Sequence, residues 1–281
     1  SEETDCVARL GGDEFAFIKT NIAFANQAAD LAHRLLLAIS EPVALPNGKT
    51  IRPSASIGVA VCPRDGISAE VLFQNCDVSL YAAKAKGRNA YAVYEAGMGA
   101  QQRETQQMEE ELQGAIERDE LVLHFQPRLD IACRRIGALE ALLRWNHPEK
   151  GLVSPMEFIA VAEGSGQIIP IGKWVLEDAL KTAAERIPDA RISINVSPVQ
   201  FRDADFVENV RAAIEASNVA PHRLELEITE NLLIEDDARA LSILTQLKSI
   251  GVNIALDDFG VGYSSLGYLS RFPFDTIKID R

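Results

Sequence analysis

The sequence lacks several features that would place it in particular classes of protein. Its four cysteines, Cys6, Cys62, Cys76 and Cys133, show no CxxC spacing, which predicts free thiols in a reducing cytosol. No apolar run approaches the roughly 20 residues that span a bilayer, and no signal-peptide pattern opens the chain. With 47% hydrophobic residues, the sequence predicts a globular cytoplasmic protein without a membrane segment in this chain.

Positive charge is also scarce, because 28 Lys and Arg face 41 Asp and Glu, for a net charge of −13. Residues 1–95 hold 9 basic and 11 acidic side chains, a balance of −2, whereas residues 96–281 hold 19 and 30, a balance of −11. This composition argues against binding to a nucleic acid polymer, which requires basic patches. An acidic region can still bind an anionic substrate when bound divalent cations reverse the local field.

Residues 1–95 predict a small α+β unit. A hairpin is expected over 6–18 around Gly11 and Gly12, and the helical periodicity of 22–40 and 69–89 predicts two helices. Strands are expected over 51–63 and 91–95. The polar stretch 99–120 predicts a solvated linker helix.

From residue 121 onward, apolar strand patterns alternate with helical ones, which predicts parallel strands covered by helices in a barrel or a doubly wound sheet. The expected strands are 121–127, 136–143, 191–196, 223–229, 252–257 and 275–280, and the expected helices are 155–163, 171–186, 203–216 and 235–249.

Polar side chains occupy every second position of three of these strands: Ser193 and Asn195, Glu225 and Glu227, and Thr276, Lys278 and Asp280. Helices cover the apolar face of such a sheet, so the polar face has no bulk solvent to meet. In a (β/α)8 barrel that face points inward, toward an active-site mouth at the strands' carboxyl ends. The pattern therefore favours a barrel with a polar interior.

Asp257 and Asp258 stand side by side at the end of the apolar run that begins at Ile254. Neighbours on a regular strand point to opposite faces, so one of these carboxylates should face the interior. A buried carboxylate without a partner is costly. We therefore expect a cation beside it.

Two families are recognisable from ordered motifs that together cover nearly the whole chain. Residues 1–95 resemble the second half of a GGDEF (diguanylate cyclase) domain, through "ARLGGDEFAFI", "SIGVAV" and "LYAAKAKGRN". Residues 112–281 resemble the EAL family of cyclic-di-GMP phosphodiesterases, through "FQP", "EALLRWNHPEKG", "INVSPVQF", "ELEITEN", "DDFGVGYSSLGYL" and "IKIDR". The resemblance implies an α/β chain in which a partial GGDEF domain (1–95, cyclase-like α+β) and a linker helix (96–111) precede an incomplete TIM-like (β/α)8 EAL barrel (112–281).

For the EAL part, the resemblance implies hydrolysis of cyclic di-GMP to linear pGpG at a two-metal site for Mg²⁺ or Mn²⁺. Lys278 resembles the lysine that orients the attacking water, and Glu230 the residue that steadies the loop after the DDFG strand. The implied metal ligands are Glu140, Asn195, Glu227 and Asp257, with Asp257 and Asp258 holding the second ion, and the implied substrate contacts are Gln126 and Arg144. Hard oxygen ligands suit these metals, and the arginine fork matches a phosphate.

For the GGDEF part, the resemblance implies that Asp13 is a metal ligand and that Lys84 and Arg88 contact a triphosphate. Gly11 and Gly12 allow close approach of the backbone to phosphates, and Glu14 offers a further carboxylate. The implied ligand is GTP. Lys84 and Arg88 can also be understood as a solvated end of a helix, favourable for its dipole.

The sequence departs from both families in three places. The chain begins inside the GGDEF domain, so it should not itself synthesise cyclic di-GMP. Glu2 replaces the arginine of the family's inhibitory RxxD motif, which keeps its Asp5, and a carboxylate would repel a phosphate there. Residues 112–281 supply 170 residues, whereas a complete barrel takes about 250. We therefore expect a piece of a longer protein, one that upstream segments could tether to a membrane.

Two rival functions are compatible with the same motifs. The parent protein could act mainly as a cyclase, or it could be a catalytically silent receptor for GTP or cyclic di-GMP. Family analogy also implies a homodimer formed through residues 259–272. Taken singly, the site residues have plainer interpretations: Glu140 as a core ion pair, Lys278 paired with Asp280, Glu225 and Arg223 as surface or rim charges, and His124 and His147 as structural or exposed residues.

Overall fold

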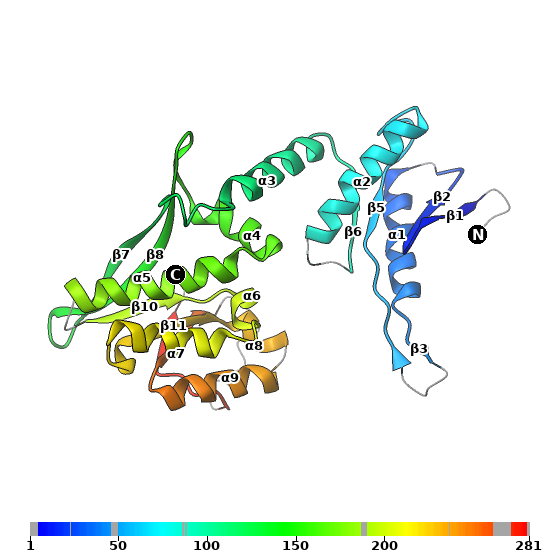
Figure 1. Cartoon of the computed structure of the whole chain (residues 1–281). Helices are drawn as coiled ribbons and strands as arrows, with labels where there is room; N and C mark the ends of the chain where they lie inside the picture. The colour runs from blue at the N-terminus through cyan, green and yellow to red at the C-terminus, as the bar shows by residue number, and fades with distance from the viewer. Residues whose placement is uncertain are drawn as a thin grey trace. The chain divides into compact units, whose positions relative to one another are not determined.

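The computed structural model describes residues 5–22, 24–45, 50–85, 87, 89–186, 190–235, 237–260 and 271–279. The chain divides into two compact units, residues 1–107 and residues 108–281 (Figure 1). No helix within the described ranges combines the length and hydropathy needed to cross a membrane.

The first unit contains a hairpin, two complete helices, the start of a third helix and two further pairs of short strands within its described residues. The hairpin is antiparallel with Gly12 in its turn, which confirms the prediction for 6–18. Strands β3 and β4 also pair antiparallel, whereas β5 and β6 pair parallel. The elements are β1 (Cys6–Gly11), β2 (Glu14–Ile18), α1 (Ala25–Ile39), β3 (Val43–Ala44), β4 (Thr50–Ile51), β5 (Ile57–Val59), α2 (Ala69–Ala85) and β6 (Tyr91–Val93).

The predicted strand over 51–63 is confirmed only in part, since it forms β4 at its start and β5 in its middle. Pro53 and Pro63 lack the backbone N–H that a strand ladder requires. These two prolines therefore limit the strand on both sides of β5.

Helix α2 packs directly against β5 at Gly58. A Cβ atom at this position would lie 2.1 Å from the carbonyl oxygen of Cys76 and 2.5 Å from the backbone nitrogen of Leu80. Because glycine has no Cβ, the helix backbone can approach the strand this closely.

Helix α3 (Met98–Leu112) begins in the first unit and ends in the second. The predicted helix over 99–120 is wrong from residue 113 onward, because Gly114 adopts a φ of +78° and the chain turns. Arg118 then donates hydrogen bonds to the carbonyl oxygens of Gln113 and Glu111, at 2.9 and 2.5 Å. Leu112 and Ala115 are buried, so this turn is part of the second unit's core rather than a solvated linker.

The second unit is built on a sheet in the order β13–β12–β11–β10–β8–β7, with β9 paired to the end of β8. The central strands are parallel, as predicted. The strands are β7 (Leu121–Asp130), β8 (Arg135–His147), β9 (Gly151–Val153), β10 (Arg191–Asn195), β11 (Leu224–Thr229), β12 (Asn253–Phe259) and β13 (Thr276–Ile279).

Strand β7 differs from the prediction, because it pairs antiparallel with β8. Only residues 131–134 connect the two strands, and a parallel pair needs a crossover of a dozen residues or more. The register of this hairpin places Gln126 opposite Glu140.

Helices cover the apolar face of the sheet, with α5, α7 and α9 side by side along it (Figure 1). The four predicted helices are confirmed, and α6, η1 and α8 are additional short elements at strand ends. The helices are α4 (Pro155–Ser165), α5 (Ile168–Arg186), α6 (Pro198–Phe201), α7 (Phe206–Ser217), η1 (Pro221–Arg223), α8 (Glu230–Glu235) and α9 (Asp237–Ile250). The arrangement confirms a TIM-like fold in the second unit.

Alternation along the strands separates the core from the polar face. Ile192 and Ile194 of β10, with Leu224 and Leu226 of β11, are buried in the apolar core. Their neighbours Ser193, Asn195, Glu225 and Glu227 point away from the covering helices, toward the inner face of the sheet. The inner face is therefore polar, as the sequence predicts.

Candidate active site

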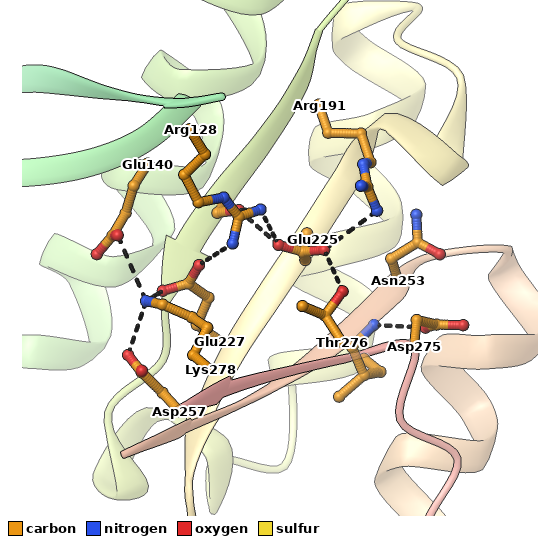
Figure 2. Close-up of polar contacts among 12 residues, drawn as sticks. Arg128, Glu140, Arg191, Glu225, Glu227, Asn253, Asp257, Asp275, Thr276 and Lys278 are labelled. Carbon is orange, nitrogen blue, oxygen red and sulfur yellow. Dashed lines mark hydrogen bonds and ion pairs between the residues drawn. The ribbon is translucent and has the colours of Figure 1, made fainter. Parts of the chain in front are cut away.

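Five strands of the second unit each send one polar side chain to a common cluster on the inner face, and Figure 2 shows four of these residues, Glu140, Glu227, Asp257 and Lys278. Their parallel register brings residues far apart in the sequence to one level of the sheet, with Asn195 opposite Glu227. The cluster consists of Glu140 from β8, Asn195 from β10, Glu227 from β11, Asp257 from β12 and Lys278 from β13.

The ammonium group of Lys278 occupies the centre of this cluster (Figure 2). Its Nζ atom makes a short hydrogen bond to Glu227 and lies 3.0 Å from Asp257 Oδ2 and 3.4 Å from Glu140 Oε2. Asn195 donates from Nδ2 to Glu140 Oε1 at 2.9 Å. The cation that the sequence predicts beside Asp257 is, in this structure, the lysine.

Burial and neighbouring charges shift the pKa of Lys278 in opposite directions. Burial would lower the pKa of the ammonium group, but its hydrogen bonds with Glu227 and Asp257 raise that pKa above its ordinary value. Glu227 is only 1% exposed, so its charge has no solvent to stabilise it. The lysine therefore stays charged and neutralises part of a strongly acidic cluster.

Asp257 and Asp258 lie on an irregularity of β12. The register with β13 shifts between Leu256 and Phe259, and Asp258 adopts a φ of +55°. The backbone N–H of Asp258 donates to Asp257 Oδ1 at 2.9 Å. Aspartate tolerates this left-handed conformation better than most residues, so β12 can be irregular here, with Asp257 directed inward and Asp258 exposed.

Glu225 is fully buried, so its interpretation as a surface or rim charge is wrong. It accepts hydrogen bonds from Ser193 at 2.7 Å, Thr276 at 3.0 Å and Arg191 at 3.3 Å, and makes a short contact with Arg128. Burial tends to raise the pKa of this carboxyl group, but the hydrogen bonds from Arg128 and Ser193 outweigh burial and hold the pKa below its usual value.

Sequence reasoning missed Arg128, although a signal was present. Arg128 is two residues beyond Gln126 in β7, and Glu225 is two residues before Glu227 in β11. The alternation that directs Gln126 and Glu227 inward also directs Arg128 and Glu225 inward. The alternation therefore predicts that Arg128 and Glu225 both face inward, although it does not predict that they pair.

Two other polar residues have structural roles. Arg223 donates to the carbonyl oxygens of Ala183 and Ala190. His147 is buried, with Nε2 at 3.1 Å from Glu111 Oε2, which supports a structural role for this residue. His124 is exposed.

The predicted substrate contacts flank the cluster. Gln126 is exposed and pairs in register with Glu140. Arg144 is half-buried, and its guanidinium donates to the carbonyl oxygen of Leu143 at 2.7 Å. Arg144 is four residues after Glu140 on the same strand, so both side chains lie on one face.

Glu230 begins helix α8 directly after β11 and is 6% exposed. Neither of its carboxylate oxygens has a hydrogen-bond partner among the residues described. Residues 261–270 of the loop that Glu230 is predicted to steady lie outside the described residues, as does Asp280.

The predicted nucleotide-binding residues of the first unit lie on two elements. Gly11, Gly12, Asp13 and Glu14 are exposed together at the β1–β2 turn, where Arg9 donates to the carbonyl oxygen of Gly12 at 2.7 Å. Lys84 is exposed in the last turn of α2. Arg88 lies outside the described residues.

The donor set of the inner cluster suits a hard divalent cation, because all its acceptors are carboxylate or amide oxygens. In the part of the chain that the structure describes, no three His, Cys, Asp or Glu side chains already stand in a geometry that holds a metal ion. A positive group nevertheless sits among Glu140, Glu227 and Asp257. These oxygen donors therefore fit a divalent cation, provided that the ammonium group of Lys278 moves out of the centre of the cluster.

Comparison with known proteins assigns both units. The EAL domain model matches residues 109–281, and the model of the diguanylate cyclase GGDEF domain matches residues 1–90. Among curated relatives, the bifunctional diguanylate cyclase/cyclic di-GMP phosphodiesterase MucR of Pseudomonas aeruginosa is 42% identical over 99% of this chain and 41% of its own length. The cyclic di-GMP phosphodiesterase PdeR of Escherichia coli is 35% identical over 100% of this chain and 42% of its own length.

Solved structures support the EAL assignment. The PaMucR phosphodiesterase in complex with c-di-GMP is 42% identical, with a TM-score of 0.60 over 62% of this chain and 72% of that one. The EAL enzyme Bd1971 bound to cAMP and cyclic-di-GMP is 33% identical, with a TM-score of 0.61 over 77% of this chain and 58% of that one. This chain spans less than half the length of the curated relatives named above. It belongs to the EAL domain family, with part of a GGDEF domain preceding the EAL unit.

Proposed function

We propose that the EAL unit hydrolyses one phosphodiester bond of cyclic di-GMP to give linear pGpG, as part of bacterial second-messenger signalling. The observation that carries this proposal is the convergence of Glu140, Asn195, Glu227, Asp257 and Lys278 from five strands onto one point. Relatives named as cyclic di-GMP phosphodiesterases, such as NbdA of Pseudomonas aeruginosa, support the choice of substrate.

Two Mg²⁺ or Mn²⁺ ions would complete the site. Glu140, Asn195, Glu227 and Asp257 would hold the first ion, and Asp257 and Asp258 would help to hold the second. Such ions lower the pKa of a bound water and neutralise charge that develops on the phosphate. They would also offset the net charge of −11 over residues 96–281, which otherwise repels an anionic substrate.

Side chains of this chain would bind the substrate and orient the attacking water. Lys278 carries three N–H donors and, once its carboxylate partners hold a metal, can direct them to the attacking water. Arg144 would exchange its hydrogen bond with the carbonyl oxygen of Leu143 for hydrogen bonds to a phosphate of the substrate, made by its planar guanidinium group. Gln126, on the neighbouring strand β7, would also contact the substrate. Glu230 would steady the loop after β12.

The first unit would bind GTP or regulate the EAL unit. Gly11, Gly12, Asp13 and Glu14 offer a turn with backbone access and two carboxylates, and Lys84 and Arg88 would contact the triphosphate. A second candidate function, synthesis of cyclic di-GMP from GTP by the full-length protein, is favoured by this intact turn and by the bifunctional relative. A homodimer formed through residues 259–272 and a cytoplasmic location, the latter consistent with four free thiols, complete the proposal.

The test is to incubate the full-length protein with cyclic di-GMP and Mn²⁺ and to separate the nucleotides by chromatography. We expect pGpG from the wild type and from Glu185→Ala, which removes an exposed acidic residue of α5. Glu140→Ala and an excess of chelator should each abolish the product. A wild type that forms no more pGpG than Glu140→Ala would contradict the enzymatic proposal and favour a receptor. A second incubation with GTP, separated by the same chromatography, tests for synthesis of cyclic di-GMP.

A further inference from the structure

Arg128 joins two buried carboxylates that belong to the same strand. Its Nη2 atom contacts Glu225 Oε1 and lies 2.7 Å from Ser193 Oγ, while its Nη1 atom lies 3.2 Å from Glu227 Oε1 (Figure 2). The guanidinium group therefore bridges Glu225, which is not among the proposed metal ligands, and Glu227, which is.

Glu225 is a fixed anchor for this bridge. It is completely buried, and its second oxygen, Oε2, accepts hydrogen bonds from Thr276 at 3.0 Å and Arg191 at 3.3 Å. Partners from β7, β10 and β13 thus hold one carboxylate of β11. Because Glu225 cannot rotate without breaking these contacts, the guanidinium bound to it has a defined position.

The two oxygens of Glu227 have different partners. Oε1 accepts a hydrogen bond from Arg128, and Oε2 accepts one from Lys278. When Lys278 yields its place to a cation, Arg128 still holds Oε1, so Oε2 keeps facing the centre of the cluster. The Glu227 carboxylate therefore cannot rotate freely, and its Oε2 atom keeps facing Glu140 and Asp257.

We propose that Arg128 is a positioning residue, which ties Glu227 to the Glu225 anchor and so orients one Glu227 oxygen toward the divalent cation of the proposed phosphodiesterase. This inference rests on the proposed function. An arginine suits the task because its planar fork reaches two carboxylates at once, whereas a lysine is a single point charge.

A purely electrostatic role for Arg128 predicts the opposite result. A fixed positive charge near the cation site repels a divalent ion, so removing that charge would tighten metal binding. A positioning role predicts weaker binding whether or not the charge is kept. Partners that orient metal ligands typically contribute about 10- to 100-fold in metal affinity.

The experiment is Mn²⁺ titration calorimetry on the full-length protein after removal of metals with a chelator. We expect the Kd for Mn²⁺ to rise about 10-fold in both Arg128→Met and Arg128→Lys. The matched control is Arg191→Met, which removes the other arginine of Glu225 and leaves the contacts of Glu227 with Arg128 and Lys278 in place. Its Kd should stay within about threefold of the wild type, since Arg128 still holds Glu227.

An unchanged or lower Kd in Arg128→Met and Arg128→Lys would overturn the inference. A wild type that binds no Mn²⁺ would instead overturn the proposed function, and the inference with it, so the two failures are distinguishable. If Arg128→Met does not fold, the double variant Arg128→Met/Glu225→Gln removes the buried charge together with its partner. We expect that variant to fold and to bind Mn²⁺ about 10-fold more weakly, and wild-type affinity in it would also overturn the inference.

Discussion

Lys278 is a single residue that pairs with three carboxylates from three strands. Replacing it by methionine leaves Glu227 buried without its ammonium partner, which we expect to lower the free energy of unfolding of metal-free protein by about 2 kcal/mol. A divalent cation can take the vacated place, so Mn²⁺ should raise the melting temperature of Lys278→Met more than that of the wild type. Thermal unfolding with chelator and with Mn²⁺ measures both effects.

Lys248→Met is the control for this prediction. Lys248 also pairs with an aspartate, Asp275, at 2.7 Å, but both side chains are about 30% exposed. An ion pair of this kind contributes at most about 1 kcal/mol, and no Mn²⁺ effect is expected. Equal stability of Lys278→Met and the wild type in chelator would show that the ammonium does not stabilise the cluster.

Asp65 in the first unit gives a prediction about pH. It is 8% exposed and accepts hydrogen bonds from Arg64 at 2.6 Å and from the backbone N–H of Val61 at 2.7 Å. Burial tends to raise its pKa, but these hydrogen bonds hold the pKa below the ordinary value of 3.8. The ionised carboxylate therefore stabilises the folded state above that value, and this stabilisation is lost as the pH falls through the lower folded-state pKa.

We expect the stability difference between the wild type and Asp65→Asn to shrink on acidification below pH 3.8. Urea unfolding followed by far-UV circular dichroism, at a series of pH values across this range, measures the difference. A difference that stays constant across the series would show that Asp65 does not titrate with a lowered pKa.

Single residues differ in how far the sequence could predict them. The alternation of polar residues was sufficient to bring Asn195, Glu227 and Lys278 to one face. In the structure Asn195 and Lys278 both hydrogen-bond to Glu140, and Lys278 also hydrogen-bonds to Glu227. The same alternation applies to Glu225, but the partner that makes its burial tolerable, Arg128, is 97 residues away. Pairing over such a distance depends on strand order, which the local pattern does not contain.

At the scale of elements, the contact between α2 and β5 depends on one missing side chain. A methyl group at Gly58 would collide with the backbone of Cys76 and Leu80, which cannot rotate away as a side chain can. We expect Gly58→Ala to lower the free energy of unfolding of the first unit by about 2–3 kcal/mol, as overpacking does. Urea unfolding followed by far-UV circular dichroism measures this loss.

Gly164→Ala is the matched control, since it makes the same substitution in α4, where an added Cβ meets nothing within 4 Å. Alanine favours a helix over glycine by about 1 kcal/mol, so this variant should be as stable as the wild type or more stable. A Gly58→Ala protein of wild-type stability would show that α2 and β5 can separate without cost.

Elements with a strong periodicity were predicted well, and their connections less well. The helices α5, α7 and α9 and the strands β10 to β13 lie close to their expected ranges. The antiparallel β7–β8 hairpin was not expected, because the apolar pattern of a strand is the same whether it pairs parallel or antiparallel. The helical pattern over 99–120 runs past the end of α3 at Leu112, because the turn that follows is fixed by Gly114, by Arg118 and by burial of Ala115. The linker helix that the family resemblance implies ends at residue 111.

At the scale of the whole molecule, the division into two units predicts two separable unfolding events. Both tryptophans, Trp145 and Trp174, belong to the second unit, where Trp145 is fully buried. Tryptophan fluorescence therefore reports the second unit, whereas circular dichroism reports both. We expect Gly58→Ala to lower the urea midpoint seen by circular dichroism and to leave the fluorescence midpoint unchanged, because compact domains with their own cores can unfold separately. Equal shifts in both signals would show that the units unfold together.

The lysine at the centre of the EAL cluster has a consequence for how the protein matures. Small zinc domains stay unfolded until their metal arrives, because metal binding supplies their free energy of folding. Here the chain brings its own counter-ion to Glu227 and Asp257, so folding does not have to wait for the metal. On the function proposed above, a freshly synthesised molecule would fold before any divalent cation binds, and metal loading would exchange one cation for another without rebuilding the fold.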